Sequence, residues 1–512
     1  MNKKKLYFCF LIALVIGCSP VKQQKTKPNV LLIIADDLGY GDVSAYGNSK
    51  INTPNIDILA NEGATFTDGH ATSATCTPSR YALFTGQYPW KNKKAKILPG
   101  DAPLLIGVNQ FTMGKMFQSK GYKTAAIGKW HLGMGKGHPD WNKTVTPGAK
   151  ETGFDYSYII AATCDRVPTA FIENGNVANL AKDDSMFVDY KHPFPGEPTA
   201  RTNPELMTKL TWTHGHNNTV INGIPRIGYM KGGRSACWVD ENIADTLLSH
   251  AKKFVTENKD KQFFLYYGLH EPHVPRMPNQ RFIGKSGMGL RGDAIIEADW
   301  CVGEILNHLK KEGVLENTLV IFSSDNGPVL DDGYDDKARE LLNGDDPSGG
   351  FRGGKYSLYE AGTRVPFFVY WKGHIKHIVS DAAVNQIDLV ASLGKLIGAE
   401  VPSGLDSKDF LNTFMGKSSK GRKSMIMEAA QRLALRSGDY DLIPPYKGPV
   451  KNITGNELGN LPQFTLFNIK KDPAQKIQIQ NENPEILKQL KEEFLETTKG
   501  YYNPNQKVMK LK

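Results

Sequence analysis

Continuous apolar runs along the chain predict strands with two buried faces. Residues 29–35, 263–269 and 318–324 are each short and without charge, and a polar segment follows each of them directly. A run of this kind is typical of a strand in a parallel sheet, where both faces are covered. Residues 124–127 predict a further strand of the same kind.

Helical periods alternate with these strands. Apolar residues recur every three or four positions in two stretches, at Ile243, Leu247, Ala251, Phe254 and Val255, and at Ile295, Ala298, Val302, Ile305, Leu306 and Leu309. We therefore predict an α/β fold in which a large, mostly parallel sheet lies between layers of helices. With 512 residues and 40% hydrophobic composition, the chain is long enough for one large domain and a smaller one.

The texture of the sequence changes near residue 403. Residues 403–422 are rich in Gly, Ser and Lys, which indicates a linker. Strand patterns follow at 424–428, 432–436 and 464–468, and a final helix is predicted to carry Ile486, Leu490, Phe494 and Leu495 on one face. We predict a main domain over residues 28–402 and a smaller C-terminal subdomain over residues 403–512.

Acidic pairs directly follow two of the predicted strands. Asp36 and Asp37 come after the first run, and Asp325 and Asn326 come after residues 318–324. Open α/β sheets build their sites at the carboxyl ends of strands. Each Asp could instead cap the helix or turn that follows it. Carboxylate and amide oxygens are ligands for calcium or magnesium, and no thiolate or imidazole cluster in the sequence argues for zinc.

Lysine and histidine side chains follow other strand patterns. Lys129 and His131 come after residues 124–127 and, two positions apart, project to the same side of an extended segment. His270 and His273 follow the run that ends at residue 269, and Lys355 lies in a Gly-rich segment. Taken singly, each such residue is more often a solvated or hydrogen-bonded group than a catalyst.

The most specific motif is Cys-Thr-Pro-Ser-Arg at residues 76–80. By itself it leaves open a small buried cysteine in a turn before a helix. Together with the acidic pairs and the basic segments, this C-x-P-x-R run resembles the maturation signature of the type I, formylglycine-dependent sulfatases. The similarity extends along most of residues 28–398. It implies an alkaline-phosphatase-like α/β core and a C-terminal subdomain made of a short antiparallel sheet with a helix.

The resemblance also implies a chemistry for Cys76. In this family a maturation enzyme oxidises the cysteine to Cα-formylglycine, and the aldehyde hydrates to a geminal diol. One hydroxyl attacks sulfur, and the other later loses its proton so that the C–O bond to sulfate breaks. A serine could attack once but has no such exit.

By the same resemblance, a divalent metal is held by Asp36, Asp37, Asp325 and Asn326, with the formylglycine at Cys76 completing the set of ligands. We expect calcium, with magnesium as the alternative. Arg80 is expected to orient the formylglycine. Lys129 and Lys355 are expected to bind the sulfate oxygens as fixed cations.

Proton transfers are assigned from the same resemblance. Asp325 accepts the proton of the attacking hydroxyl, and His131 is the base that releases sulfate in the second step. His273 donates a proton to the departing alcohol, with Lys355 assisting. We prefer His273 to His270 because the family's histidine is followed by x-Pro.

The N-terminus predicts export as a bacterial lipoprotein. A basic start at residues 3–5 precedes an apolar stretch over residues 6–16, which is too short to span a membrane. Residues 15–18 resemble a lipobox, although a plain secretory signal is the alternative. We expect a signal peptide at residues 1–17, lipidation of Cys18 and a tether over residues 18–27. The protein would then be periplasmic and held at the membrane by its lipid alone, with cell-surface display as the alternative.

Charge narrows the choice of partner. The formal net charge of +10 suits an anionic substrate such as a sulfated glycan. Nucleic acid is the competing partner for a basic protein, but the lysines are scattered and an exported lipoprotein meets little nucleic acid, so we expect none. After Cys9, Cys18 and Cys76, three cysteines remain. Because three is an odd number, we expect no role that depends on disulfides.

The insert over residues 148–230 has the Gly and Pro content of binding loops, and we name Asp165, Arg166 and His216 as substrate-binding candidates. The acidic residues 331–336 form either a solvated turn or a site for sugar hydroxyls. These loops resemble those of bacterial N-acetylgalactosamine-6-sulfatase-like proteins, which implies a 6-O-sulfated galactose or N-acetylgalactosamine substrate. Two other classes remain open, namely a phosphatase or phosphonate monoester hydrolase of the same superfamily and a non-catalytic glycan-binding lipoprotein.

Overall fold

The structure is a computed structural model that describes residues 27–47 and 50–506. The predicted signal peptide, Cys18 and the tether before residue 27 lie outside the described residues. Within the described part, no helix has the length and apolar character needed to cross a bilayer.

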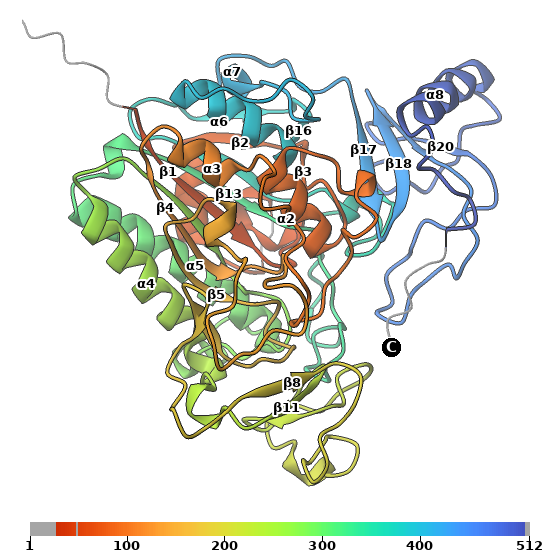
Figure 1. Cartoon of the computed structure of the whole chain (residues 1–512). Helices are drawn as coiled ribbons and strands as arrows, with labels where there is room; N and C mark the ends of the chain where they lie inside the picture. Colours follow the sequence, from red (N-terminus) through yellow and green to blue (C-terminus); the bar gives the residue numbers. More distant parts are fainter. Residues whose placement is uncertain (1–26, 48–49, 507–512) are drawn as a thin grey trace, which may run out of the picture.

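A ten-stranded sheet forms the centre of the molecule (Figure 1). Its strands, in spatial order, are β15 (Ile378–Ser380), β2 (Ala64–Phe66), β14 (Phe367–Tyr370), β13 (Thr318–Ser324), β1 (Asn29–Ala35), β12 (Phe263–Gly268), β4 (Lys123–Lys129), β5 (Tyr156–Ile160), β6 (Phe171–Glu173) and β7 (Asn176–Val177). The middle five, from β13 to β5, run parallel, and antiparallel pairs join β14 to β13 and β6 to β5. Every residue of β1, β12 and β13 is buried, which accounts for the continuous apolar runs and confirms the predicted parallel sheet.

Helices cover both faces of this sheet. One layer contains α1 (Pro54–Asn61), α4 (Ile243–Asn258) and α5 (Gly289–Lys311), and the other contains α2 (Cys76–Thr85), α3 (Met113–Gln118), α6 (Leu389–Ile397) and α7 (Leu411–Phe414). Alternate residues of β1 point to opposite layers: Leu31 and Ile33 pack with α4 and α5, whereas Leu32 and Ile34 pack with the other helices. The predicted α/β architecture is therefore confirmed.

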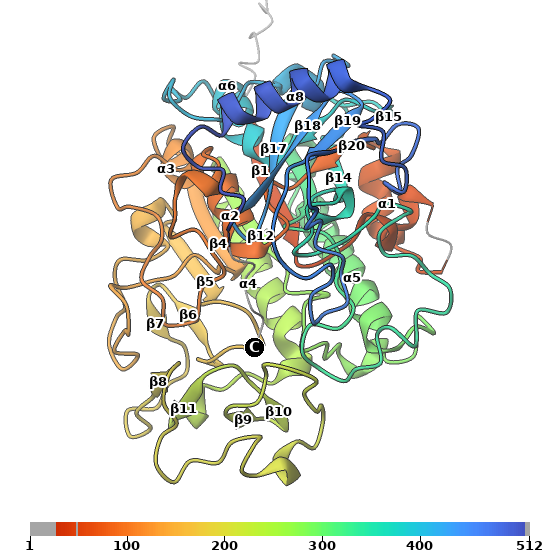
Figure 2. The same cartoon turned by 90° about the vertical axis from the view of Figure 1, so that its right-hand side faces the viewer.

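A second, four-stranded antiparallel sheet lies near the C-terminus (Figure 2). Its strands are β17 (Ser424–Ala429), β18 (Arg432–Ser437), β19 (Tyr440–Ile443) and β20 (Thr465–Asn468), with α8 (Pro484–Thr497) packed on them. Leu490 and Phe494 of α8 are buried as predicted, but Leu495 is 40% exposed. The prediction for Leu495 was wrong because one helical step turns a side chain about 100° away from its neighbour.

Residues 403–422, whose composition indicates a linker, contain α7 and pack against the main domain. Phe414 is buried, and the guanidinium of Arg422 contacts the carboxylate of Asp388 at 2.5 and 2.6 Å. Despite a composition rich in Gly, Ser and Lys, this segment is therefore fixed to the main domain by two buried side chains, Phe414 and Arg422.

The first part of the insert joins the central sheet as β5, β6 and β7, and the part after β7 forms a lobe at one end of the molecule (Figures 1 and 2). It contains two small antiparallel pairs, of β8 (Phe187–Asp189) with β11 (Tyr229–Lys231) and of β9 (Val220–Ile221) with β10 (Ile224–Pro225). A further parallel pair joins β3 (Gly69–His70) to β16 (Val384–Asn385). The lobe contacts the main domain where the Tyr334 hydroxyl donates to the Pro225 carbonyl at 2.5 Å.

Candidate active site

The two acidic pairs meet because their strands are neighbours. β1 and β13 are parallel and in direct register, so Asp36 and Asp37 leave the sheet beside Asp325 and Asn326. The Asn326 side-chain amide donates to Asp37 Oδ1 at 2.7 Å, and the Asp37 backbone N–H lies 3.3 Å from Asp325 Oδ1. All four side chains are buried, so their charges share one water-poor pocket.

This donor set fits a divalent metal ion. Asn326 Oδ1 is buried and has no hydrogen-bond partner among the described residues. Oxygen atoms of Asp36 and Asp37 and a ring nitrogen of His273 lie within 4.8 Å of one another. Burial is the main cause that raises the pKa values of Asp36 and Asp37, which means that their charges are poorly compensated. A bound cation of oxygen-preferring type would supply that compensation.

Cys76 begins helix α2 and faces this pocket. Only 2% of its surface is exposed. Burial raises the pKa of its thiol, and the nearby ammonium groups of Lys129 and Lys355 offset this only in part. No side chain caps the helix at Thr75, so backbone N–H groups remain at this end to favour a negative charge. An unmodified Cys76 is a neutral thiol at pH 7 and hence a weak nucleophile.

Arg80 lies one helical turn beyond Cys76 and is fully buried. Its Nε and one terminal nitrogen contact Asp325 Oδ2 at 2.9 and 2.8 Å, and its other terminal nitrogen donates to the Lys129 carbonyl and to the Tyr266 hydroxyl. This fork of contacts connects α2 to the ends of β4, β12 and β13. Arg80 therefore holds the helix that carries Cys76 against the acidic pocket.

Two lysines reach the pocket from different elements. Lys129 Nζ lies 2.6 Å from Asp36 Oδ1 and 3.4 Å from Asp325 Oδ2. Lys355 Nζ lies 2.8 Å from Asp37 Oδ2 and 2.8 Å from Asp332 Oδ2. Burial favours the neutral amines, but the surrounding carboxylates outweigh it and hold the pKa of both lysines above its usual value. The site thus contains two fixed cations.

The histidines differ in what they face. His131 Nε2 donates to the Leu98 carbonyl at 2.9 Å, and its Nδ1 has no hydrogen-bond partner among the described residues. His273 Nδ1 donates to the Val274 carbonyl at 2.6 Å, so its Nε2 points toward Asp37 Oδ2, 3.8 Å away. Burial, together with nearby lysines, lowers the pKa of both rings well below 6.5. Both are therefore neutral, each with one ring nitrogen free to accept a proton.

His270 lies in a different environment. Its Nδ1 is 3.1 Å from Glu271 Oε1, and burial lowers its pKa to about 3. Of the two histidines weighed from the sequence, His273 is thus the one beside Asp37 and Lys355.

The acidic turn contributes a residue that was not predicted as part of the site. Asp332 is buried and bound to Lys355, and the Tyr356 hydroxyl donates to it at 3.1 Å. Asp336 is also buried, on Arg276 at 2.7 Å. Of the two alternatives for residues 331–336, a solvated turn does not describe Asp332 and Asp336, because both are buried on cationic partners distant in the sequence. The one sequence signal was the position of these acids directly after the Asp325 pair.

The three substrate-binding candidates form one cluster. Asp165 Oδ1 accepts from Arg166 at 2.9 Å, and Asp165 Oδ2 pairs with His216 Nε2 at 2.8 Å. Burial opposes the charged form of Asp165, but Arg166 and His216 outweigh it and hold the pKa of this carboxyl well below its usual range. His273 acts electrostatically on Asp165, and Cys76 acts on Arg166, so the cluster lies within electrostatic range of the site.

A second cluster of acids outside this site is occupied by arginines. Asp68, His70 and Glu360 come within 4.8 Å of one another, but Arg364 and Arg436 each contact both carboxylates, at distances of 2.5 to 3.1 Å. We call these five residues the arginine network. It joins the main domain to β18 of the C-terminal sheet and is built as an ion-pair network rather than a metal site.

Comparisons with known proteins agree with this geometry. The sequence model of the family described as Sulfatase matches residues 28–399. The chain is 47% identical to N-acetylgalactosamine-6-O-sulfatase of Bacteroides thetaiotaomicron over 498 residues, covering 95% of this chain and 97% of that protein. It is 28% identical to arylsulfatase A of Homo sapiens over 510 residues, covering 94% of this chain and 89% of the relative.

Solved structures show the same likeness. A structure from a Bacteroides thetaiotaomicron locus for the metabolism of multiple glycosaminoglycans superposes with a TM-score of 0.90 at 47% identity, covering 92% of this chain and 99% of that one. A Pseudoalteromonas sulfatase superposes with a TM-score of 0.68 at 27% identity, covering 95% and 93%. With the C-x-P-x-R helix, the acidic pocket and two fixed lysines in one place, the chain belongs to the sulfatase family and is a sulfuric ester hydrolase.

Proposed function

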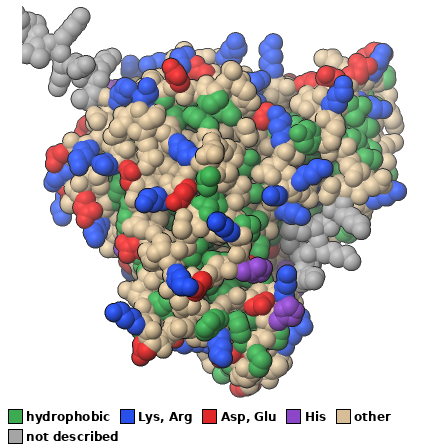
Figure 3. All heavy atoms as spheres, viewed as in Figure 1, with side chains coloured by type: hydrophobic (Ala, Val, Ile, Leu, Met, Phe, Trp, Pro, Cys, Tyr) green, Lys and Arg blue, Asp and Glu red, His purple; other side chains and the backbone are tan. Residues whose placement is uncertain are grey.

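We propose that the protein removes 6-O-sulfate from N-acetylgalactosamine or galactose units of sulfated glycans, glycosaminoglycans in particular. The observation that carries this proposal is the 47% identity to an N-acetylgalactosamine-6-O-sulfatase along 95% of the chain, which includes the insert with Asp165, Arg166 and His216. The net charge of +10 supports an anionic polymer as substrate. Basic side chains are scattered over the face shown in Figure 3 rather than gathered in one stripe.

Binding of the sulfate group falls to the two buried lysines. Lys129 and Lys355 hold positive charge from two sides of the pocket, where low water content strengthens their pull on sulfate oxygens. Arg166, held by Asp165 through one terminal nitrogen, offers its other guanidinium N–H groups to the sugar beside the sulfate. His216, whose ring nitrogens face Asp165 and the His214 carbonyl, keeps Asp165 in place. The buried ion pairs preorganise these donors, so that little rearrangement is needed when substrate enters.

The group that reacts is proposed to be formylglycine, made from Cys76 by a maturation enzyme. In hydrated form it supplies a hydroxyl nucleophile and an exit for sulfate, neither of which the buried thiol can supply. Asp36, Asp37, Asp325 and Asn326 would hold the metal, for which calcium is our choice because its sites accept irregular oxygen geometry. Magnesium is the alternative.

Proton transfers are assigned to one carboxylate, Asp325, and to the free ring nitrogens of two histidines, His131 and His273. Asp325, held ionised by Lys129 and Arg80, can accept the proton of the attacking hydroxyl. His131 keeps its Nδ1 lone pair free and can take a proton in the step that releases sulfate. His273 can donate from Nε2 only after it has been protonated, a change that a bound sulfate ester favours because an anion stabilises the imidazolium.

The site of action is proposed from residues outside the described part of the chain. The lipobox-like residues 15–18 support processing at Cys18, anchoring by lipid and exposure in the periplasm or at the cell surface. Radiolabelled palmitate that enters the wild-type protein but not a Cys18→Ala variant would support this assignment. Equal labelling of the two proteins would contradict it.

The substrate is tested with matched esters. Purified protein that carries formylglycine should release sulfate from N-acetylgalactosamine-6-sulfate much faster than from the 4-sulfate, and faster than phosphate from the 6-phosphate. Ion chromatography measures both anions. Preference for the phosphate ester would show a phosphatase, and preference for the 4-sulfate would refute the assigned position.

Variants at position 76 test the reacting group. Cys76→Ala should be inactive while keeping the thermal stability of the parent. Cys76→Ser should release at most one equivalent of alcohol and then retain sulfate on the serine, visible by mass spectrometry. Full turnover by either variant would refute the role of formylglycine.

A further inference from the structure

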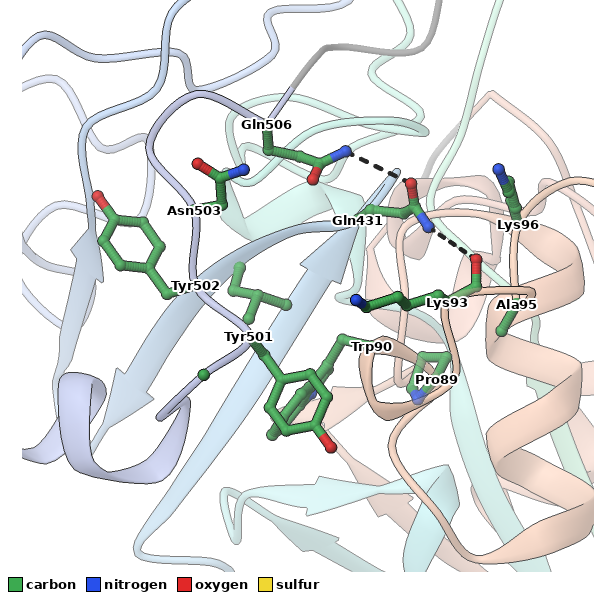
Figure 4. A pocket seen from close by; sticks show the side chains of 12 residues that line it. Pro89, Trp90, Lys93, Ala95, Lys96, Gln431, Tyr501, Tyr502, Asn503 and Gln506 are labelled. Carbon is green, nitrogen blue, oxygen red and sulfur yellow. Dashed lines mark hydrogen bonds between the residues drawn. The ribbon is translucent and has the colours of Figure 1, made fainter.

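A pocket of about 420 Å³ lies between the main domain and the C-terminal subdomain, outside the site described above. It is lined by three segments far apart in the sequence, namely residues 89–96, the β17–β18 turn with Leu433, and residues 500–506. Figure 4 shows these segments around one hollow. We call it the Trp90 pocket.

Hydrogen bonds join the three walls. Gln431 Nε2 donates to the Lys93 carbonyl at 3.2 Å, and Gln506 Nε2 donates to Gln431 Oε1 at 3.4 Å (Figure 4). Gln431 therefore bridges the loop of the main domain and the C-terminal segment. The pocket has a defined shape because hydrogen bonds connect its walls.

The floor of the pocket is aromatic. Trp90 and Tyr501 meet edge to face with ring centroids 5.0 Å apart. Trp90 is only 8% exposed, and its indole N–H is buried with no hydrogen-bond partner in the described residues. Tyr501 is 44% exposed and presents an aromatic surface with a hydroxyl at its end. Such a surface suits a ring that is apolar on its C–H face and polar at its edge.

The rim of the pocket is positively charged. Lys93 and Lys96 line it, and Figure 4 shows Lys93 extending toward the C-terminal segment. None of the lining residues is acidic, and neither lysine forms an ion pair among the residues that the structure describes. By contrast, neighbouring Lys91 is paired with Asp406 at 2.5 Å. The pocket thus has two cations available for an anionic ligand.

Two connections place the pocket next to the active site. The Leu98 carbonyl accepts a hydrogen bond from His131. Lys96 is two residues before Leu98, so the Cα atoms of Lys96 and Leu98 are at most about 7 Å apart. On the other wall, the Gln431 backbone N–H donates to Glu428, and the carboxylate of Glu428 also accepts from the Ser73 hydroxyl, three residues before Cys76. The walls of the Trp90 pocket are therefore linked to the active site through Leu98 on one side and through Glu428 on the other.

We propose that the Trp90 pocket is a distal subsite that binds an anionic sugar, sulfated or a uronic acid, of the same glycan chain whose sulfate ester is cleaved. An aromatic floor, amide donors and acceptors, and two free ammonium groups match a saccharide ring with a negative substituent. The inference rests on the proposed function, since it takes the ligand to be the polymer of which the substrate unit is part. It gives the enzyme a preference for chains over single sugars.

Two lysine variants test the subsite with a matched control in the same loop. Lys93→Gln with Lys96→Gln removes both rim charges, whereas Lys94→Gln removes an exposed charge that does not line the pocket. The substrates are N-acetylgalactosamine-6-sulfate and an octasaccharide of alternating uronic acid and 6-O-sulfated N-acetylgalactosamine. An exposed ion pair contributes at most about five-fold to affinity. We therefore expect KM for the octasaccharide to rise about three- to ten-fold in the double variant, with KM for the monosaccharide and the Lys94→Gln enzyme unchanged.

Binding separates this proposal from the proposed function. In the Cys76→Ala background, calorimetry should give a Kd for the octasaccharide that is three- to ten-fold weaker after Lys93→Gln and Lys96→Gln, and also weaker after Tyr501→Ala. Equal Kd and KM values in the lysine variants and their controls would overturn the subsite. Failure of the wild-type enzyme to cleave either 6-sulfated substrate would refute the proposed function, while the Kd values still decide the subsite.

Discussion

The arginine network gives a sharp test of how buried charge stabilises this fold. Arg436→Met would remove a guanidinium that contacts Asp68 at 2.9 Å and Glu360 at 3.1 Å while keeping an apolar side chain of similar length. Arg436 is 6% exposed and Glu360 is fully buried, so water cannot replace the lost partner. Arg364 would remain as the single guanidinium between the two carboxylates.

The magnitude follows from the pKa of Glu360. Burial opposes its charged form, but Arg364 and Arg436 outweigh burial and lower the pKa from 4.5 to about 2. At roughly 1.4 kcal/mol for each pKa unit, that difference corresponds to about 3 kcal/mol of net stabilisation that remains after the arginines have offset burial. Loss of one partner of a buried ion pair typically costs about 3–5 kcal/mol, because the remaining charge is left uncompensated. We expect Arg436→Met to lower the free energy of unfolding by about 2–4 kcal/mol at pH 7.

The pKa of Glu360 also predicts how the free energy of unfolding changes with pH. A depressed carboxyl pKa contributes stability that is complete above the unfolded value of 4.5 and is lost as the pH falls toward about 2. In the variant Glu360 has lost one cationic partner, so its pKa is higher than in the wild type. As the pH falls, Glu360 is therefore protonated earlier in the variant, and protonation removes the unfavourable buried charge. The difference in stability between wild type and variant should therefore narrow between pH 7 and pH 4.

Urea denaturation followed by circular dichroism at both pH values provides the measurement. Lys395→Met is the matched control, because Lys395 pairs with Asp409 at the surface, where an ion pair contributes at most about 1 kcal/mol. The reasoning fails if Arg436→Met costs no more than Lys395→Met at pH 7, or if its deficit grows as the pH falls.

Three further predictions concern the active site. Exhaustive chelation should abolish activity and lower the melting temperature, because the carboxylates around Asp37 lose their cation, and added calcium should restore both. Full activity without metal would refute the metal site. Lys355→Met should lower kcat about 10²- to 10³-fold, as for other positioned charges, and a change below three-fold would exclude a role on sulfate. His273→Ala should slow hydrolysis of a sulfated sugar far more than hydrolysis of an activated aryl sulfate, whereas His131→Ala should slow hydrolysis of both esters. Rates measured on the two esters test this, and a selective loss in His270→Ala instead would show that His270 is the general acid.

Much of the fold could be predicted because its signals are local. The apolar runs of β1 and β13 identify strands covered on both faces, and the periods of α4 and α5 identify the helices that cover them. β19 was not predicted, since its four residues carry too little pattern to stand out. The positions of Asp36 and Asp325 after apolar strands, taken together with the C-x-P-x-R motif, favoured one shared metal site over two separate caps.

The sequence by itself determined the parallel core, the family resemblance and the residues of the acidic pocket, because each depends on hydrophobic period, on a contiguous motif or on the end of a strand. Only the tertiary structure decided which partner each charge has. Asp332 binds Lys355, His131 donates to the carbonyl of Leu98, and residues 89–96 meet residues 500–506 at the Trp90 pocket. The physical reason is that such pairings depend on contacts between segments brought together by folding, and residue types alone do not encode which segments meet.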